Sequence, residues 1–369
     1  MTIVGVIGGG QLARMMIPAA LNLGLELRVF SEKKSDPAGL ATTQVGDYNN
    51  LGELMEFVRN LDVVTFDHEH VPTEILRKVR ESGMVVAPSP EALALTHNKI
   101  TMRRALAEID VPQPRWCVVE NGAGFDSALD AVGGFPCIAK KPTGGYDGKG
   151  VRVIESLVEI EDWLSVGPIL LEEKVPFVRE LALLSARRLG GQWQPWAPVE
   201  TRQDNGVCSV VIAPAPAIDG ALVGRSEELA RAIADHVGVV GVLAVEVFEL
   251  ADGSLLVNEL AMRPHNSGHV LTELSVTSQF EQHLRAVVDL PLGSADLRAP
   301  VGVMVNLFGA IPGASLSPAL EAVPEAKVHD YTKDPRPGRK VGHVVVLGKD
   351  AEVTLERANL VRELIHTPG

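Results

Sequence analysis

The chain has 369 residues, a formal net charge of −13 at pH 7 and an apolar share of 46%. This length allows two or three domains, and the negative charge argues against a protein that wraps nucleic acid or lies on an anionic membrane. We therefore expect neither a nucleic-acid partner nor a membrane partner. The chain opens on a strand-like segment and has no apolar run of membrane-spanning length, so neither a signal peptide nor a transmembrane helix is expected.

The cysteines Cys117, Cys137 and Cys208 have no spacing typical of a metal site. Their odd number also argues against a disulfide framework. We expect free thiols in a reducing compartment, and therefore a cytoplasmic protein.

The first glycine-rich turn predicts a phosphate-binding site. Strands are predicted over Thr2–Ile7 and Leu25–Phe30, with a helix between them. The turn matches G-x-G-x-x-A from Gly8, and Glu32 follows the second strand roughly where a ribose-binding acid lies in dinucleotide folds. An NAD site is one interpretation. The helix N-terminus could equally hold a substrate phosphate, with the amide of Gln11 as a hydrogen-bond partner for a sugar phosphate.

A third strand is predicted over Leu61–Phe66, and acids alternate with histidines in the following segment Asp67–His70. Ligands gather beyond the carboxyl ends of strands in an open α/β sheet. Because alternate residues of an extended segment point to opposite faces, a single carboxylate facing the substrate, Glu69, is expected here rather than a metal site. Val85–Pro88 is predicted to be the last strand of this domain, and a helix over Pro90–Ile109 leads out of it.

A second glycine-rich loop, Thr143–Gly150, lies between strands predicted over Phe135–Ala139 and Val151–Ile154. Backbone N–H groups in such a loop can approach phosphate oxygens, and Lys140 at the strand end adds a positive charge for the same anion. A flexible hairpin is the alternative. The loop is not a Walker loop, because the G-x-x-x-x-G-K-[ST] pattern is absent from the sequence.

The next predicted elements are an amphipathic helix over Glu155–Leu164 and a strand over Pro168–Val175 that ends in acidic residues. Glu180 opens a further strand, Leu181–Arg187. A strand edge with a carboxylate at its end suits the hydroxyl groups of a ribose. A solvated strand end is the alternative.

A hairpin is predicted to bring two glutamates together. Strands are expected over Val242–Leu250 and Leu255–Leu260, with Asp252–Gly253 as a two-residue loop. That loop pairs residues whose numbers sum to 505, so Glu246 is expected directly opposite Glu259, since 246 + 259 = 505.

Directly opposed like charges destabilise a sheet, so a cation is expected between these two carboxylates. The same alternation places Phe248, Leu255 and Val257 on their face, at the end of which the pair would lie. Carboxylates and an adjacent amide, Asn258, are hard oxygen ligands that suit Mg²⁺. A pair splayed into solvent, or one protonated carboxyl group, is the alternative.

The segment Ala261–His269 follows directly and contains an arginine, two histidines and small polar residues. Arginine binds an oxyanion through two N–H groups, and histidine can donate a hydrogen bond or transfer a proton. This composition beside the paired acids predicts a site that handles an anion.

The C-terminal segment is predicted to contain strands over Val301–Phe308 and Val341–Leu347 and a closing helix over Glu352–Ile365. The loop Lys333–Lys340 carries four cations in an otherwise acidic chain. Such a group of cations can bind a phosphate partner, and a solvated turn is the alternative.

Four segments carry a resemblance to a known family: Gly8–Met15, Thr143–Gly150, Asn258–His269 and Arg336–His343. The glycine-rich loop after a strand lysine and the two acids on a hairpin resemble the ATP-grasp superfamily. In combination and in this order, the four segments resemble the 5-(carboxyamino)imidazole ribonucleotide synthase family, ATP- and bicarbonate-dependent ligases of purine biosynthesis. The resemblance spans nearly the whole chain.

The resemblance implies an α/β ATP-grasp fold with three domains. A Rossmann-like N-terminal domain is expected over residues 1–97, and an ATP-grasp domain over 98–290 with a flap subdomain at about 117–187. A small C-terminal domain is expected over 291–369. The resemblance also implies a homodimer.

The resemblance further implies which residues bind which ligand. The residues expected around ATP are Lys99, Lys140, Gly145, Tyr146, Asp147, Gly148, Lys149, Gly150, Glu172, Glu173, Lys174, Val175, Glu180, Asn258 and Glu259. Mg²⁺ is expected between Glu246 and Glu259. Bicarbonate and the carboxyphosphate made from it are expected at Arg263, His265 and Asn266. The residues expected at 5-aminoimidazole ribonucleotide are Gln11, Glu69, Tyr146, Asp147, Lys333 and Arg339.

The chain departs from the family pattern at a few positions. Asp67 stands at the first position of a segment often written E-x-E, Met262 replaces a common proline, and the match around Gln203 is loose. The roles of Asp67 and Gln203 therefore stay open.

The reaction implied is a ligation. A bicarbonate oxygen attacks the γ-phosphate of ATP, and the exocyclic amine of the ribonucleotide reacts with the carboxyphosphate or with CO₂ released from it. Asp147 is a candidate for orienting that amine or taking its proton, beside Tyr146. The alternatives are another ATP-grasp acyl-phosphate ligase, such as a formate-dependent glycinamide ribonucleotide transformylase, an NAD-dependent oxidoreductase, and an inactive nucleotide-binding protein.

Overall fold

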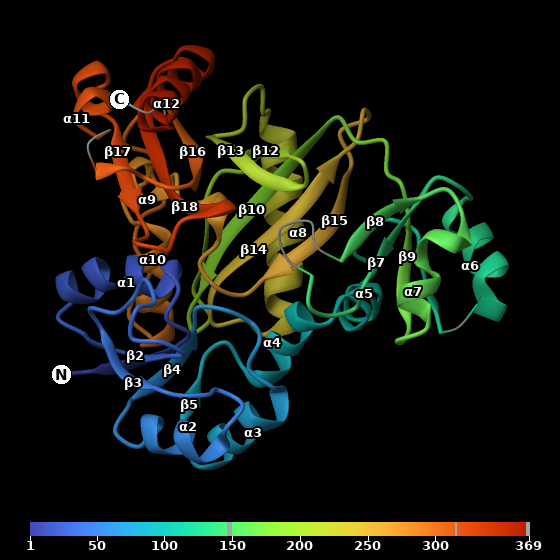
Figure 1. Cartoon of the computed structure of the whole chain (residues 1–369), viewed down its shortest axis with the longest axis horizontal. Coiled ribbons are helices and arrows are strands. Elements are labelled where there is room, and N and C mark those ends of the chain that lie inside the picture. Colours follow the sequence, from blue (N-terminus) through green and yellow to red (C-terminus); the bar gives the residue numbers. More distant parts are fainter. Residues whose placement is uncertain (121, 146–149, 314–315, 367–369) are drawn as a thin grey trace.

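The computed structural model describes residues 1–120, 122–145, 150–313 and 316–366 (Figure 1). Its N-terminal sheet has the parallel strand order β3-β2-β1-β4-β5, with β1 paired to both β2 and β4. The strands are β1 (Ile3–Ile7), β2 (Glu26–Ser31), β3 (Thr42–Val45), β4 (Val63–Phe66) and β5 (Val85–Val86). The predicted strands of this segment are confirmed to within two residues. The edge strand β3 was not predicted, because its sequence T-T-Q-V is mostly polar and half-exposed.

Helices cover both faces of the N-terminal sheet. On one face, α2 (Leu51–Val58) and α3 (Thr73–Glu81) share a hydrophobic core with Phe30 and Phe66. On the other face, α1 (Gln11–Asn22) packs with α10 (Gln279–Val287) over Val6. Figure 1 shows α10 beside α1, although the two helices lie far apart in the sequence. The second covering helix is therefore supplied by a late part of the chain.

The helix predicted over Pro90–Ile109 is two helices, α4 (Pro90–His97) and α5 (Lys99–Ala107). The break lies at Asn98, whose backbone is extended at φ −130° and ψ 114°. Its side-chain oxygen accepts hydrogen bonds from the N–H groups of Ile100 and Thr101, as an N-cap does. The break places Lys99 in the first turn of a new helix.

The flap sheet is the antiparallel sheet with the order β6-β9-β7-β8. It lies apart from the N-terminal sheet, at the right of Figure 1. Its elements are β6 (Trp116–Val119), η1 (Gly122–Gly124), α6 (Phe125–Val132), β7 (Cys137–Lys140), β8 (Val151–Ile154), η2 (Leu157–Ile160), α7 (Glu161–Leu164) and β9 (Ile169–Glu173).

The helix predicted over Glu155–Leu164 is wrong in its first half, which forms only the 3₁₀ turn η2. The Glu159 carboxylate accepts hydrogen bonds from Glu155 N–H and Ser156 Oγ, both at 3.0 Å. Such local side-chain bonds compete with a regular helix.

The central sheet has the order β15-β14-β10-β12-β13-β16-β18-β17, and β11 pairs with β10. Its strands are β10 (Arg179–Arg187), β11 (Trp193–Pro195), β12 (Val199–Asp204), β13 (Val207–Ala213), β14 (Gly241–Glu249), β15 (Leu255–Ala261), β16 (Val301–Gly309), β17 (Lys327–Asp330) and β18 (Arg336–Gly348). Because β13 pairs with β16, the C-terminal strands extend the same sheet. The remaining helices are α8 (Gly220–Val237), η3 (Asn266–Gly268), α9 (Leu271–Leu274), α11 (Leu316–Ala322) and α12 (Ala351–His366).

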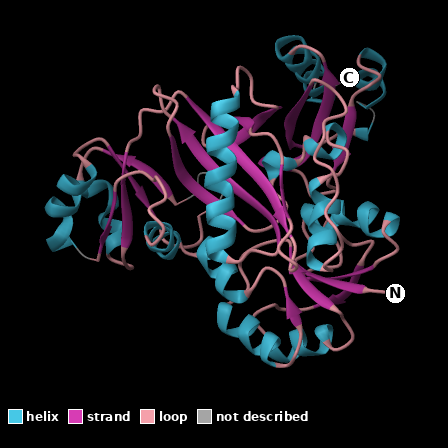
Figure 2. Cartoon of the chain, turned by 180° about the vertical axis from the view of Figure 1, so that it is seen from behind, coloured by secondary structure: helices cyan, strands magenta, loops and turns pink. Residues whose placement is uncertain are grey.

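Helix α8 covers one face of the central sheet, as the view from behind shows (Figure 2). Its Leu222 and Ile233 are buried in one core with Leu183 and Val245. Since side chains alternate along a strand, Glu246 lies on the opposite face. The face away from α8 therefore carries the predicted carboxylates.

The hairpin of β14 and β15 corrects one prediction and confirms another. Glu249 pairs with Leu255, so the connecting turn is longer than the predicted two residues. Glu246 nevertheless pairs with Glu259, because the register shifts by one residue next to this pair. The shift is a β-bulge, in which an extra residue on one strand re-aims its neighbours. It has a second effect, since Val257 now pairs with Val247.

The predicted grouping of side chains around the glutamates is therefore wrong. Leu255 and Val257 belong to the apolar core under α8, together with Val245 and Val247. Without the bulge, strict alternation would have kept these residues on the face of Glu246. The two glutamates thus lie across the sheet from this core.

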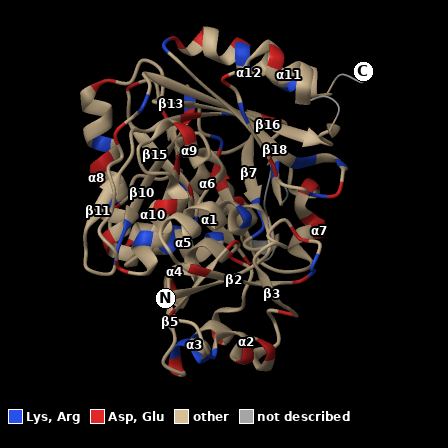
Figure 3. Ribbon diagram, turned by 90° about the vertical axis from the view of Figure 1, so that its left-hand side faces the viewer, with Lys and Arg blue, Asp and Glu red and all other residues tan. Residues whose placement is uncertain are grey.

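Acidic and basic residues are interspersed on surface helices such as α3 and α12 (Figure 3). An ion pair of 3.1 Å joins Arg77 on α3 to Glu91 on α4. Among the described residues, there is no helix both long enough and apolar enough to cross a lipid bilayer.

A buried histidine on α10 links the N-terminal sheet to the central sheet. Val242 N–H on β14 donates to His283 Nδ1 at 3.1 Å, so the ring proton lies on Nε2. Nε2 lies 2.7 Å from Thr65 Oγ1 on β4 and donates to it. Burial lowers the pKa of His283 to about 3 from its ordinary 6.5. The neutral ring is therefore the form that the fold requires.

This histidine should make the protein sensitive to acid. Below pH 6.5 the unfolded chain binds a proton at this position and the folded chain does not, until the pH reaches about 3. Stability from this residue is therefore complete above pH 6.5 and is lost as the pH falls through that window. Between pH 7.5 and 5 we expect a loss of about 2 kcal/mol that His283→Gln does not show in urea unfolding.

The isosteric variant Thr65→Val is the control, because it keeps the imidazole. It should lower the free energy of unfolding by a similar amount at both pH values. Equal pH dependence in the wild type and in His283→Gln would contradict the assignment of the neutral ring.

Candidate active site

A network of buried charges joins the flap sheet to the edge of the central sheet. The Glu172 carboxylate on β9 lies 2.7 Å from Arg103 Nε on α5 and 2.7 Å from Lys140 Nζ on β7. Arg103 also donates to the backbone oxygens of Val257 and Asn258 on β15, at 2.7 and 2.9 Å. Lys140 Nζ donates to Asn258 Oδ1 at 3.0 Å. The side chains of the two cations therefore reach the bulged part of β15.

Burial alone would raise the pKa of Glu172, but Lys140 and Arg103 hold it at about 2. Burial lowers the pKa of Lys140, against the opposing charge of Glu172. Both oxygens of Glu172 are thus engaged by cations, and its side chain is 2% exposed. The residue predicted to contact ATP acts here as the ionised centre of a buried network.

The paired glutamates form the centre of the site. Lys99 Nζ at the start of α5 makes an ion pair with Glu259 Oε1. His265 Nε2 lies 3.4 Å from Glu246 Oε1 on the other strand. Desolvation, followed by the charges of Glu259 and Glu180, raises the pKa of Glu246 to about 7. The negative charges of Glu259 and Glu180 therefore oppose the ionisation of Glu246 on this face of the sheet.

This donor set fits a divalent cation. Two opposed carboxylates need a positive charge between them, and carboxylate and amide oxygens are the ligands that Mg²⁺ prefers. Among the described residues, no group of three or more histidine, cysteine, aspartate or glutamate side chains is arranged to hold a metal by itself. Two carboxylates are the usual share of the protein where a nucleotide supplies phosphate oxygens.

The loop after β15 presents His265 to the glutamates. Its Nδ1 accepts from Ser267 N–H at 3.4 Å and lies 2.8 Å from Ser267 Oγ, so the ring proton lies on Nε2, toward Glu246. The histidine is thus held in one tautomer beside the proposed cation ligands.

The Asn266 amide lies against the Cys208 thiol on β13. Burial raises the pKa of this thiol to about 12.

Arg263 is oriented by Glu69 from the N-terminal domain. The Glu69 carboxylate accepts from Arg263 Nε at 2.8 Å and from Nη2 at 3.4 Å. Burial raises the pKa of Glu69, but Arg263 overcomes that effect and holds it at about 2. Pro264 O accepts from Nη1, so these partners take three of the five N–H groups of Arg263. The two predicted residues are brought together from segments far apart in the sequence.

Backbone N–H groups of the first glycine-rich turn form hydrogen bonds with a side chain of the protein itself. Asp67 accepts from Gly10 N–H at 2.9 Å and from Ala13 N–H at 2.8 Å, so a carboxylate caps the N-terminus of α1. A Cβ atom on Gly10 would lie 2.1 Å from Asp67 Oδ2, and Gly8 has a positive φ of 105°. These contacts give Asp67 a structural role and weaken the dinucleotide interpretation. Gln11 is the first residue of α1, beside this cap.

The end of β9 and the start of β10 carry further residues predicted to contact ATP. Glu173 Oε2 lies 2.6 Å from Arg115 Nε. Lys174–Val175 follow β9 in the connection to β10, the lysine exposed and the valine buried. Burial raises the pKa of Glu180, and a hydrogen bond from Gln203 opposes this effect.

Part of the second glycine-rich loop lies outside the described residues. Lys141 N–H donates to Gly150 O at 2.8 Å and closes the base of the loop. Gly145 and Gly150 belong to the described residues on either side. The predicted site residues outside them are Tyr146, Asp147, Gly148 and Lys149.

The predicted basic loop Lys333–Lys340 is wrong in its second half, because Arg336–Lys340 form the start of β18. The positive charge of Lys340 lowers the pKa of Glu246, against the larger effect of burial. Lys333 Nζ lies 5.4 Å from the centre of the Tyr331 ring. Arg339 is half-buried on β18, next to Lys340. Lys340 is therefore the cation of the C-terminal segment that acts on the paired acids.

Arg103, Cys208 and Lys340 were not predicted as site residues. Arg103 lies four positions after Lys99 within the predicted helix, a spacing that puts two side chains on one helical face. This spacing could have identified it. Cys208 carries no such signal, because it reaches the site through the pairing of β13 with β12 and of β12 with β10.

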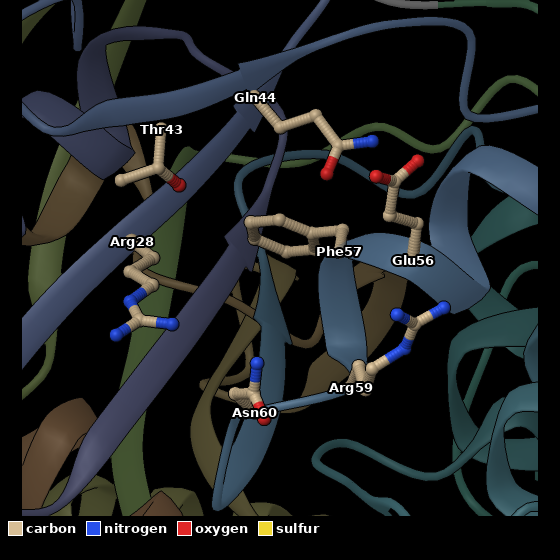
Figure 4. Close-up of a pocket in the computed structure, with 7 residues that line it drawn as sticks. All are labelled: Arg28, Thr43, Gln44, Glu56, Phe57, Arg59 and Asn60. Carbon is tan, nitrogen blue, oxygen red and sulfur yellow. The ribbon is translucent and has the colours of Figure 1, made fainter.

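The pocket of Figure 4 lies elsewhere, at the outer edge of the N-terminal sheet. Its lining comes from β2, β3 and the end of α2: Arg28, Thr43, Gln44, Glu56, Phe57, Arg59 and Asn60. None of these residues belongs to the predicted site.

Comparison with known proteins agrees with this geometry. Residues 1–97 match the ribonucleotide synthetase preATP-grasp domain, residues 104–280 the ATP-grasp domain, and residues 302–357 the phosphoribosylaminoimidazole carboxylase C-terminal domain. The chain is 47% identical to an N5-carboxyaminoimidazole ribonucleotide synthase of Mycobacterium tuberculosis, over 97% of this chain and 86% of the relative.

Two solved structures are similar along their whole length. The N5-carboxyaminoimidazole ribonucleotide synthetase of Thermus thermophilus superposes with a TM-score of 0.90 at 34% identity, covering 99% of both chains. The synthase of Aspergillus clavatus, solved with ADP and 5-aminoimidazole ribonucleotide, gives a TM-score of 0.89 at 28% identity and covers 99% of this chain and 98% of that one.

The fold and the site define an ATP-grasp ligase, with a preATP-grasp domain before it and a further domain after it. The expected α/β ATP-grasp fold is therefore confirmed. Within that class, the chain belongs to the N5-carboxyaminoimidazole ribonucleotide synthase family, which is the family indicated by the sequence motifs.

The buried network predicts a large difference between two neighbouring glutamates. Glu172→Gln leaves Arg103 and Lys140 buried without their shared anion, and we expect the free energy of unfolding to fall by about 3 kcal/mol or more. Glu173→Gln breaks a pair whose arginine is 61% exposed, and should cost no more than about 1 kcal/mol. Urea denaturation without nucleotide measures both. Equal losses in the two variants would contradict the proposed role of Glu172.

Proposed function

We propose that this chain carboxylates 5-aminoimidazole ribonucleotide with ATP and bicarbonate in purine biosynthesis. The observation that carries the proposal is the Glu246–Glu259 pair, which is held in register by the bulge in β15 and lies between Lys99 and His265. Cations on one side of the pair suit a polyphosphate, and the histidine on the other side suits an acceptor of its γ-phosphoryl group. Likeness to the synthase solved with ADP and the ribonucleotide supports the choice of substrates.

Mg²⁺ is part of this proposal, with Glu246 and Glu259 as its protein ligands. When bound, the ion neutralises phosphate charge and orients the phosphoryl group for in-line transfer. Lys99 and Lys140 lie on the nucleotide side and add charge for the same oxygens. Lys140 is aimed by Asn258 and Glu172, so its position does not depend on solvent.

On the acceptor side, Arg263 and His265 bind bicarbonate in our proposal. The Glu69 carboxylate fixes the plane of the guanidinium group, which leaves further N–H groups for an oxyanion. His265 Nε2–H donates toward the same space in the tautomer set by Ser267. Asn266 adds its amide to this set.

The reaction is proposed in two steps. A bicarbonate oxygen forms a bond to the γ-phosphorus, and the bond from that phosphorus to the bridging oxygen of ADP breaks. The exocyclic amine then forms a bond to the carbon of carboxyphosphate, or of CO₂ released from it. Inorganic phosphate leaves with the electron pair of its bond to that carbon, and the amine gives up one proton. Carboxyphosphate is destroyed by water, so the site must exclude water while it exists.

The ribonucleotide is proposed to lie between the N-terminal and C-terminal segments. Gln11 lies at the carboxyl edge of the N-terminal sheet, where ligands of such sheets gather. Lys333 and Arg339 supply cations for its phosphate. Tyr146 and Asp147 complete the set in our proposal.

We also propose domains at residues 1–97, 98–290 and 291–369, a homodimer and a cytoplasmic location. The free thiols Cys117, Cys137 and Cys208 are compatible with a reducing compartment. Light scattering coupled to gel filtration tests the dimer, which requires twice the mass of one chain.

The activity is tested by coupled ADP release, with each substrate omitted in turn. We expect release that requires both 5-aminoimidazole ribonucleotide and bicarbonate. Formate with glycinamide ribonucleotide serves as the control pair and should give none. Release with the control pair, or release indifferent to the ribonucleotide, would contradict the proposed function.

The paired acids are tested by Glu259→Gln. The change keeps the shape of the side chain and removes one of two anionic ligands, so we expect a loss of kcat of at least about a hundredfold, since the ion contributes several kcal/mol. Glu228→Gln, on the exposed side of α8, is the control and should retain activity. Unchanged turnover in Glu259→Gln would contradict the metal assignment, provided that circular dichroism shows the same fold.

A further inference from the structure

Gln279, at the start of α10, is buried at 0% exposure directly under the loop that carries His265. His265 N–H donates to Gln279 Oε1 at 2.8 Å, and Gln279 Nε2 donates to His265 O at 2.9 Å. Nε2 also lies 3.0 Å from His269 Nδ1, at the other end of the loop. One amide group therefore contacts both ends of the segment His265–His269.

We propose that Gln279 is a positioning residue for the reaction, which holds the His265–His269 loop so that His265 faces Glu246. This inference rests on the proposed function and adds a residue to it. The hydrogen bonds of Gln279 go to the backbone of His265 and to the ring of His269. Gln279 acts through the loop.

The direction of each hydrogen bond follows from the backbone. A backbone N–H can only donate, so the atom that faces His265 N–H must be the amide oxygen. The Gln279 Nε2 group is then the donor to His265 O and to His269 Nδ1, which fixes the His269 proton on Nε2. Glutamate at this position would lack the donor, and methionine would lack both donor and acceptor.

The loop is shaped to fit this amide. A Cβ atom on Gly268 would lie 2.3 Å from Gln279 Oε1 and 2.7 Å from Leu184 Cδ2. Gly268 therefore allows the chain to wrap closely around the glutamine. Ser278 fixes the start of α10, because its Oγ accepts from Glu281 N–H at 3.1 Å.

The helix itself is anchored in the N-terminal domain. Phe280 and Leu284 are buried in the core formed with α1, and His283 bonds to Thr65 on β4. Gln279 thus connects α10, which is anchored on the N-terminal sheet, to the His265–His269 loop by hydrogen bonds. A shift of about 1 Å in a positioned group can lower activity about a hundredfold.

The same helix provides a matched control. Gln282 is also 0% exposed and also makes a reciprocal pair, with Gly293: its Oε1 accepts from Gly293 N–H and its Nε2 donates to Gly293 O, both at 2.8 Å. Its partner lies in the connection after α10 and is not part of the His265–His269 loop. Loss of either glutamine removes buried hydrogen bonds, but only Gln279 touches His265.

The test compares Gln279→Met with Gln282→Met in the full-length protein. Both should lower the melting temperature. We expect kcat for ribonucleotide-dependent ADP release to fall about 10- to 100-fold in Gln279→Met, with KM for ATP unchanged, and to stay near the wild-type value in Gln282→Met. Equal kcat values in the two variants would overturn the proposal.

Two further measurements test the same positioning role of Gln279. If Gln279→Met does not fold, Gly268→Ala takes its place, because the new methyl group presses on the same amide, and a wild-type kcat in Gly268→Ala overturns the proposal. Nitrogen chemical shifts of the His265 and His269 rings should change in the Gln279 variant and not in the Gln282 variant. Unchanged shifts overturn the positioning role even where the wild type lacks the proposed activity, which separates the two failures.

Discussion

The structure depends first on one buried carboxylate. Glu172 is held between Arg103 and Lys140, and through them the flap sheet is attached to the edge strand of the central sheet. Desolvation of such a network costs free energy, and removal of one member strongly destabilises the fold. The network therefore acts mainly as a geometric constraint and adds little net stability. Its effect is to fix Lys140 relative to the bulged strand, and therefore to place one cation of the site with a precision that a solvated lysine on a loop would not have.

The second constraint is the bulge in β15. It puts side chains that regular alternation would place on one face of the sheet onto opposite faces. Residues before it, such as Val257, fill the core under α8, while Glu259 after it faces Glu246. Arg103 takes up the backbone oxygens of Val257 and Asn258 at the same place. The backbone oxygens at the bulge are thus hydrogen-bonded by the same cation that holds Glu172. The apolar core, the charged network and the acidic pair therefore meet at three consecutive residues.

Much of the fold could be predicted from sequence because most strands follow apolar patterns, and the Glu246–Glu259 pair followed from counting across a hairpin. The counting succeeded although its assumed turn was wrong, because the bulge offset the longer turn. Gln279 and the cap formed by Asp67 could not be predicted, since each depends on a partner from a distant segment. Local pattern specifies elements, whereas burial of a polar side chain is decided by which elements meet. The family resemblance indicated which ligands to expect, and the residue pattern alone does not identify them.

The position of α10 has a consequence for synthesis of the chain. The N-terminal sheet looks like a complete unit in the sequence, yet Val6 and Met16 are covered by Phe280 and Leu284, which are translated much later. A nascent chain that ends before α10 exposes an apolar face on this sheet, and Thr65 lacks its buried partner. The N-terminal domain therefore finishes folding only after nearly the whole ATP-grasp segment has left the ribosome, and an isolated N-terminal fragment would need a substitute for that helix to stay in solution.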